Sequence, residues 1–339
     1  MSSATANPGS QRAGGPGTGS VPVPAARLAQ FPVSFFAMVM GLAGLAIAWE
    51  KAAAMLEVEL SLVPWLIGLS VLLFGVLLAV YIAKLLVYPV GVLAEIRHPV
   101  RLNFMPTISI SLLLLAVALL HSAPSVSLWF WALGALAQLL FTLYIVSVWM
   151  HHQHFQIQHM NPSWFIPAVG NALVPIAGVP LGFVEVSWFF FSIGVLLWSV
   201  LMTIVFYRVL FHQSIDARLM PTLFILIAPP AVAFIAYLQL TNTLDVFAQA
   251  LYFVGLFLTV LLFSQARRFF RLDFYLSWWA YSFPLAAVSI ACMRMFDQTG
   301  VALHAYLGFA LLTLLTGIVL MLSVSTVIAV RERGICIPE

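Results

Sequence analysis

Ten apolar stretches, separated by short clusters of polar and charged residues, make up most of the chain. Each is about long enough to cross a bilayer, since a helical span needs roughly 20 mostly apolar residues. No Asp, Glu or Arg lies near the middle of any stretch. The pattern predicts an all-α polytopic membrane protein with ten transmembrane helices, at residues 32–49, 62–84, 104–120, 127–150, 163–181, 187–211, 219–240, 244–266, 274–293 and 302–330.

Composition supports a lipid bilayer as the surrounding medium. Hydrophobic residues make up 63% of the chain and charged residues 7%, whereas a soluble domain has about 25% charged residues. The formal net charge of +3 is explained by membrane topology, so no nucleic-acid partner is predicted. Residues 1–28, rich in Gly, Ser, Pro and Ala, are expected to be a disordered cytoplasmic tail. Residues 29–331 form the predicted transmembrane domain, and 332–339 a short cytoplasmic C-terminal tail.

The distribution of Lys and Arg predicts the orientation. If the N-terminus is cytoplasmic, all but two of the 14 basic residues fall on the cytoplasmic side, and the exceptions are Lys51 and Arg294. Cytoplasmic loops carry such an excess of Lys and Arg. We therefore expect a multi-pass protein of the plasma (bacterial inner) membrane with both termini in the cytoplasm.

Helix breakers fall in alternate stretches. The even-numbered stretches have no internal proline, whereas the odd-numbered ones contain Gly41, Pro106, Pro167, Pro175, Pro229 and Pro284. Proline removes a helical hydrogen bond and kinks the helix, and in lipid the freed carbonyl needs another partner. We expect kinked helices inside and straight helices outside, as five helical hairpins around a central pore. The alternative is that proline is simply commoner in membrane helices.

The spans lack the groups that chemistry would need. A proton-coupled pump usually has an ionisable residue within the membrane, but Glu185, Asp245 and His121 all sit at span ends. No nucleophile, phosphate-loop or zinc-helix motif occurs. No cofactor is predicted, and passive permeation is favoured over an enzyme.

A His-rich loop follows the fourth stretch and contains His151, His152, His154 and His159. The spacing of these histidines matches no standard ligand pattern. We interpret the loop as polar and pH-sensitive, and predict no metal site there.

Two polar residues of the odd stretches have competing interpretations. Asn171 either bonds a carbonyl freed by a nearby proline or contacts the pore. Arg294, at the outer end of the ninth stretch, either attracts anions or extends to the lipid headgroups. Both cysteines, Cys292 and Cys336, are expected to be free thiols.

Four segments carry a family resemblance. They are the residues EIRHPVRLNF at 95–104, NPS at 161–163 with PAVGN at 167–171, IAPP at 227–230, and WWAYSFP at 278–284. In this order, and with ten spans over residues 30–330, the chain resembles the tellurite-resistance/dicarboxylate transporter family. That family includes the bacterial TehA-type proteins and the plant slow-type guard-cell anion channels.

The resemblance implies a pore formed by odd-numbered helices, with one pore in each subunit of a homotrimer. It also implies that Phe283 plugs the pore midway and that a small residue of the first helix, Ala37, faces this ring. Relatives often carry a proline where this chain has Val39, so the shape of the first helix is expected to differ.

Three functional hypotheses follow. The leading hypothesis is a channel for small inorganic or organic anions that an aromatic plug gates. The second is a secondary carrier, proton-linked or not, for anions such as C4-dicarboxylate, sulfite or tellurite. A membrane enzyme or redox protein is a distant third.

Overall fold

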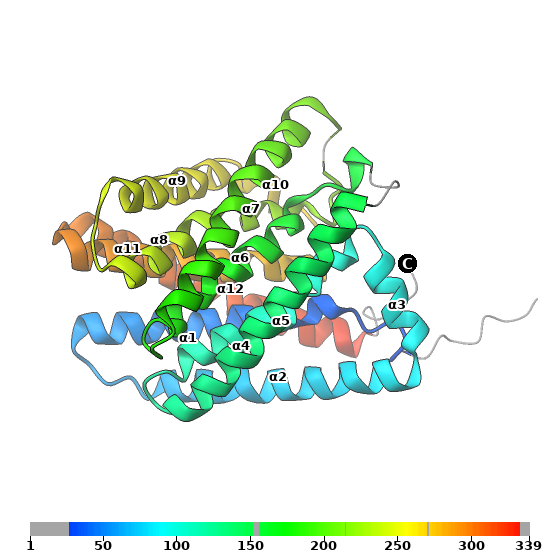
Figure 1. The fold of residues 1–339 in the computed structure, drawn as a ribbon, viewed down its shortest axis with the longest axis horizontal. Helices are drawn as coiled ribbons and strands as arrows, with labels where there is room; N and C mark the ends of the chain where they lie inside the picture. Colours follow the sequence, from blue (N-terminus) through cyan, green and yellow to red (C-terminus); the bar gives the residue numbers. More distant parts are fainter. Residues whose placement is uncertain (1–26, 152–155, 214, 270, 333–339) are drawn as a thin grey trace, which may run out of the picture.

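The structure, a computed structural model, describes residues 27–151, 156–213, 215–269 and 271–332. Most of the predicted N-terminal tail, His152, His154, Cys336 and nearly all of the predicted C-terminal tail lie outside these ranges. The described residues are mainly α-helical and contain no strand. The α-helices are α1 (Phe36–Leu56), α2 (Leu62–Val87), α3 (Pro89–Arg97), α4 (Thr107–Ala118), α5 (Pro124–His151), α6 (Phe165–Gly178), α7 (Val184–Phe211), α8 (Ala228–Thr241), α9 (Val246–Phe263), α10 (Ala266–Phe269), α11 (Ser282–Thr299) and α12 (Ala302–Arg331) (Figure 1).

Nine helical segments among the described residues are long and apolar enough to cross a membrane. They correspond to nine of the ten predicted stretches. The fifth stretch forms a shorter element, a 3₁₀ turn η4 (Pro162–Trp164) followed by α6, which contacts α4, α5, α7 and α8. Whether α6 counts as a tenth span therefore stays a prediction.

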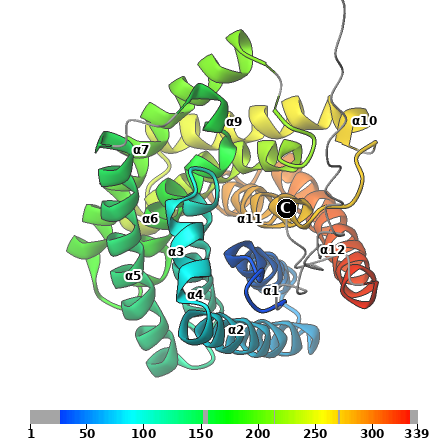
Figure 2. The same cartoon turned by 90° about the vertical axis from the view of Figure 1, so that its right-hand side faces the viewer.

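The helices form two layers, as the alternation of prolines predicts. Helices α1, α4, α6, α8 and α11 make a closed inner ring in which each contacts the next. Figure 2 shows α2, α5, α7, α9 and α12 outside this ring. Each of the nine spans has an apolar core. In the inner spans 72–78% of the core residues are buried, and in the outer spans 28–39% are buried. The outer helices expose large apolar side chains, which suits contact with lipid.

Every inner helix begins with a 3₁₀ segment. These segments are η1 (Val33–Phe35), η2 (Arg101–Phe104), η4, η5 (Met220–Ile227) and η6 (Leu276–Tyr281). They also contact one another in a closed ring, at one end of the bundle. A further 3₁₀ turn, η3 (Ile157–His159), lies in the loop before η4. The sequence did not predict the 3₁₀ segments or the short helices α3 and α10.

The prolines mark the change from 3₁₀ to α-helix. Pro106 is the N-cap residue of α4, and Pro167, Pro229 and Pro284 lie in the first turns of α6, α8 and α11. A first-turn proline is tolerated because the N–H that it lacks would have no helical partner. Of the described α-helices, only α6 has a proline beyond its first turn, and this residue is Pro175. The expected kinks are therefore mostly replaced by a change of helix type.

A buried ionic cluster fixes the start of the first inner helix. Lys84 of α2 lies 3.1 Å from the carboxylate of Glu95 on α3 and donates a 2.7 Å hydrogen bond to the carbonyl of Phe31. The hydroxyl of Tyr81 donates to the same carboxylate at 3.0 Å. Because Phe31 lies two residues before η1, which leads into α1, the cluster ties that helix to α2 and α3.

Candidate functional site

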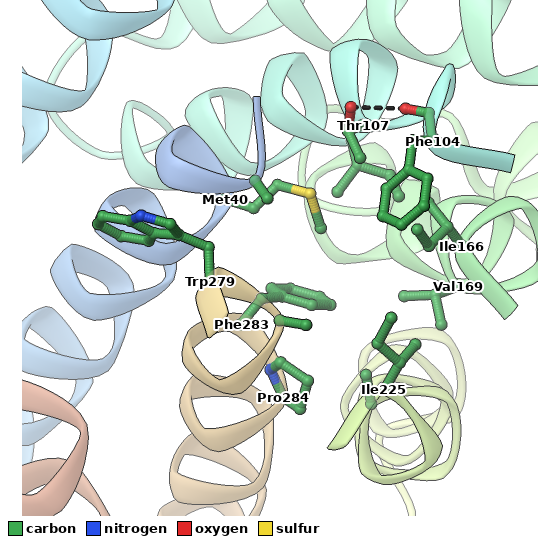
Figure 3. Close-up of a pocket in the computed structure, with 13 residues that line it drawn as sticks. Met40, Phe104, Thr107, Ile166, Val169, Ile225, Trp279, Phe283 and Pro284 are labelled. Atoms are coloured by element: carbon green, nitrogen blue, oxygen red, sulfur yellow. Dashed lines mark hydrogen bonds between the residues drawn. The ribbon is translucent and has the colours of Figure 1, made fainter. Parts of the chain in front are cut away.

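A small cavity lies inside the inner ring (Figure 3). All five inner segments contribute to its wall, as expected for the centre of a five-hairpin bundle. Its volume is about 40 Å³, which leaves room for about three water molecules. An anion with its hydration shell does not fit. The residues that line the cavity are Ala37, Met40, Phe104, Thr107, Ile110, Ile166, Val169, Ile225, Ala228, Trp279, Ala280, Phe283 and Pro284.

The cavity lies where the five inner α-helices begin. Each of them lines it with a residue of its first turn, and these residues are Ala37, Thr107, Ile166, Ala228 and Phe283. The N-terminal end of a helix carries the positive end of the helix dipole. Because the 3₁₀ segments precede these helices, five positive ends lie at this end of the bundle, and none of the described residues that line the cavity is charged.

Phe283 occupies the inner side of α11. Its side chain is 7% exposed, and its ring points into the space among Met40, Val169 and Ile225 (Figure 3). Pro284 follows directly in the first turn of α11, beside the same cavity. An apolar ring in this position narrows the centre of the inner ring of helices.

The surface of the cavity is almost wholly apolar. Two lining side chains carry hydrogen-bond donors, and both are already used. The hydroxyl of Thr107 donates to the carbonyl of Phe104 at 2.6 Å. The indole N–H of Trp279 donates to the hydroxyl of Thr326 on α12 at 3.0 Å, away from the cavity. The remaining lining side chains are those of Ala, Met, Phe, Ile, Val and Pro.

The structure separates the residues that the sequence predicted for the pore into two groups. Ala37, Phe283 and Pro284 line the cavity. Gly41, Pro106, Pro167, Asn171, Pro175 and Pro229 are not among its lining residues. Pro106, Pro167 and Pro229 instead lie next in sequence to lining residues.

Asn171 faces the outer layer. Its amide N–H₂ donates to the hydroxyl of Thr142 on α5 and to the carbonyl of Pro167, each at 2.8 Å. The amide of Gln138 on α5 donates to the same carbonyl at 2.8 Å, and the hydroxyl of Ser109 on α4 donates to Gln138 Oε1 at 2.7 Å. This network supports the structural interpretation of Asn171, since it holds α4, α5 and α6 together.

Arg294 lies at the far end of α11 from the cavity. Its guanidinium donates to the side-chain oxygen of Gln239 on α8 at 3.0 Å, so it joins two inner helices. Nearby along α11, Asp297 forms an ion pair with Lys51 of α1. These side chains belong to the opposite mouth of the inner ring.

The two described histidines of the predicted loop make local contacts with the backbone. The imidazole of His151 lies 2.9 Å from the carbonyl of Ser147. His159 accepts a hydrogen bond from the backbone N–H of Gln156. In the described part of the chain, no three His, Cys, Asp or Glu side chains are grouped as metal ligands would be. Cys292 is a free, buried thiol, as predicted.

Sequence reasoning missed most of the cavity wall. A local signal was available, because four lining residues are immediate neighbours of the predicted prolines. Thr107 follows Pro106, and the residues that precede Pro167, Pro229 and Pro284 are Ile166, Ala228 and Phe283. Other wall residues, such as Met40 and Ile225, have no comparable signal.

Comparisons of the sequence relate the chain to known membrane transport proteins. The profile of a family described as voltage-dependent anion channel matches residues 30–327. An S-type anion channel of Arabidopsis thaliana is 32% identical over 289 residues, which cover 81% of this chain and 54% of that protein. An uncharacterized transporter of Methanocaldococcus jannaschii is 26% identical over 309 residues, 84% of this chain and 90% of the relative.

A tellurite resistance protein TehA homolog of Haemophilus influenzae is 27% identical over 293 residues, which cover 81% of this chain and 85% of the relative. The chain thus spans about half the length of the plant relative and most of the length of the two microbial ones.

Proposed function

The chain belongs to the voltage-dependent anion channel family, and from this membership and the central cavity we propose that it conducts small anions across a membrane. The observation that carries the proposal is the convergence of five inner α-helices on one apolar cavity. Their positive dipole ends favour a negative charge without any basic side chain. Selectivity then comes from pore width and backbone dipoles.

Phe283 is the gate in this proposal. Its ring lies among Met40, Val169 and Ile225 (Figure 3), in a cavity too small for a hydrated anion. An apolar constriction excludes water and so costs the permeating ion its hydration. A rotamer change of Phe283, or a shift of α11 relative to α1, would widen the path.

We propose that the end with the 3₁₀ ring faces the cytoplasm. Basic residues support this orientation, because Lys84, Arg208 and Arg331 lie in the last turns of the outer helices α2, α7 and α12. Cytoplasmic ends of spans are rich in such residues. Both termini are then cytoplasmic, in the plasma (bacterial inner) membrane. Arg294 stands at the outer mouth, where it attracts anions.

The proposed assembly is a homotrimer with one pore in each subunit, as the family resemblance implies. The second candidate function is a secondary carrier for an anion such as C4-dicarboxylate, sulfite or tellurite. A small central cavity lined by all five inner segments also suits the binding site of a carrier, and one relative is named a transporter.

Current through the purified protein in planar bilayers tests the proposal. Under unequal anion concentrations, a channel gives a reversal potential close to the anion's equilibrium potential. We expect Phe283→Ala to raise the current about ten-fold, equal to about 1.4 kcal/mol of barrier. Phe189→Ala, the same change on a lipid-facing side chain of α7 that is 53% exposed, should leave the current unchanged.

Equal currents for Phe283→Ala and the unmodified protein would refute the gate. Flux that saturates at low anion concentration and follows a proton gradient would favour the carrier.

A further inference from the structure

The cavity is unusual for a path that ions are proposed to cross, because it offers a water molecule almost nothing to bond. The hydroxyl of Thr107 donates to the carbonyl of Phe104, and the indole N–H of Trp279 donates to the hydroxyl of Thr326. Buried water typically makes two to four hydrogen bonds, and cavities lined by apolar side chains stay dry. In the closed state, water is therefore a poor occupant of this space.

We infer that this cavity is a binding site for a small uncharged apolar solute, of the size of a xenon atom or a methane molecule. Such a solute loses nothing by leaving its hydration shell, and it gains dispersion contacts with the wall. The wall offers polarisable groups at close range, namely the thioether of Met40 and the rings of Phe104, Trp279 and Phe283. The volume of about 40 Å³ sets the upper limit on size.

A solute can reach the site from one end. Ala37, Phe104 and Ala280 are each partly exposed, while Phe283 and Ile110 are buried. Phe104 and Ala280 belong to the 3₁₀ segments η2 and η6, and Ala37 lies in the first turn of α1, next to η1. The opening is thus at the end where the 3₁₀ segments form their ring. The solute would rest against Phe283 and hold the ring in its closed position.

The consequence for transport rests on the proposed function. If the cavity lies on the conduction path, an apolar occupant blocks the path without any charge. The block would not depend on voltage, because a neutral solute does no work in the electric field.

Anomalous diffraction from crystals of the full-length protein under xenon pressure tests the site directly. We expect a xenon peak among Met40, Val169 and Phe283. Ala280→Leu fills the cavity from η6 and should abolish the peak, and Ala37→Leu provides a second filling variant from α1. Gly317→Ala is the matched control, because a Cβ at that position of α12 meets nothing within 4 Å. A structure without xenon in the cavity, or with the peak unchanged in both filling variants, would overturn the inference.

Bilayer current tests the block separately. We expect xenon-equilibrated buffer to lower the current at least about two-fold in the unmodified protein and in Gly317→Ala, compared with nitrogen at the same pressure. A cavity-filling variant that still conducts should show no xenon effect. If xenon binds in the crystals but leaves the current unchanged, the binding site is supported and its place on the conduction path is refuted. If xenon lowers the current equally in the filling variants, xenon acts through the lipid, and the proposed block at the cavity is refuted.

Discussion

Gly41 of α1 packs directly against Ser282 of α11, the residue before the proposed gate. A Cβ built on Gly41 would lie 2.9 Å from the Cβ of Ser282 and would overlap its hydroxyl. It would also lie 3.0 Å from the ring of Trp279. The lack of a side chain at Gly41 therefore sets how closely α1 and α11 approach, and so fixes the distance across the cavity between Met40 and Phe283.

Gly41→Ala should push these two helices apart. Overpacking a well-packed interior costs about 1–3 kcal/mol, so we expect a lower midpoint of thermal unfolding in detergent and a higher anion current. The double variant Gly41→Ala/Ser282→Gly removes the main overlap and should partly reverse both effects. Gly75→Ala on α2 is the control, since a Cβ there meets nothing within 4 Å. A Gly41→Ala protein with unaltered stability and current would contradict this account.

Ala37→Phe should block conduction. Ala37 lines the same cavity as Phe283, and a second aromatic ring would fill a space of about 40 Å³. We expect the current to fall about ten-fold or more, while the protein still reaches the membrane. Ala79→Phe introduces the same ring on the exposed face of α2 and should conduct normally. Normal current through Ala37→Phe would place the conduction path elsewhere.

Lys84→Met should destabilise the protein strongly. It leaves the buried carboxylate of Glu95 without its cation, 3.1 Å away, and breaking one side of such a pair costs about 3–5 kcal/mol. The double variant Lys84→Met/Glu95→Gln removes the uncompensated charge and should be more stable than Lys84→Met. Chemical unfolding in mixed micelles measures the free-energy difference. If the double variant is the less stable of the two, the pairing of these groups is not what holds α2 to α3.

Gly170→Ala should disturb the packing of α6 on α5. A Cβ on Gly170 would overlap the side-chain amide of Gln138, whose N–H₂ holds the carbonyl of Pro167 at 2.8 Å. We expect a loss of about 1–3 kcal/mol from overpacking. The double variant Gly170→Ala/Gln138→Ala creates the missing space, so its loss should be smaller than the sum of the two single losses. Strict additivity would mean that the two residues do not compete for the same volume.

The arrangement of layers was predictable from the sequence because it follows from local requirements. A helix satisfies its own backbone hydrogen bonds, so in lipid the length of an apolar stretch is enough to indicate a span. The alternation of prolines then separated inner from outer helices. The position of Phe283 came from the family resemblance, not from spacing, because the chain has 27 phenylalanines and the local pattern does not distinguish them.

The role of Asn171 shows what the sequence left open. The residue was expected either to bond a backbone carbonyl or to contact the pore, and the choice depends on the rotation of α6 about its axis. In the fold, Asn171 turns towards Thr142 while Val169, two positions earlier, faces the cavity. Because α6 is buried on nearly all sides, its pattern of apolar residues carries little information about which face points inward.

The sequence by itself determined the nine apolar segments of the described residues that are long enough to cross a membrane, the two layers and the position of the prolines, since each depends on the length and composition of one segment. The tertiary structure alone decided the ring of 3₁₀ segments, the pairing of Lys84 with Glu95 and the apolar wall of the cavity. These features arise where residues far apart in the chain meet, and only packing fixes the rotation and depth at which helices meet.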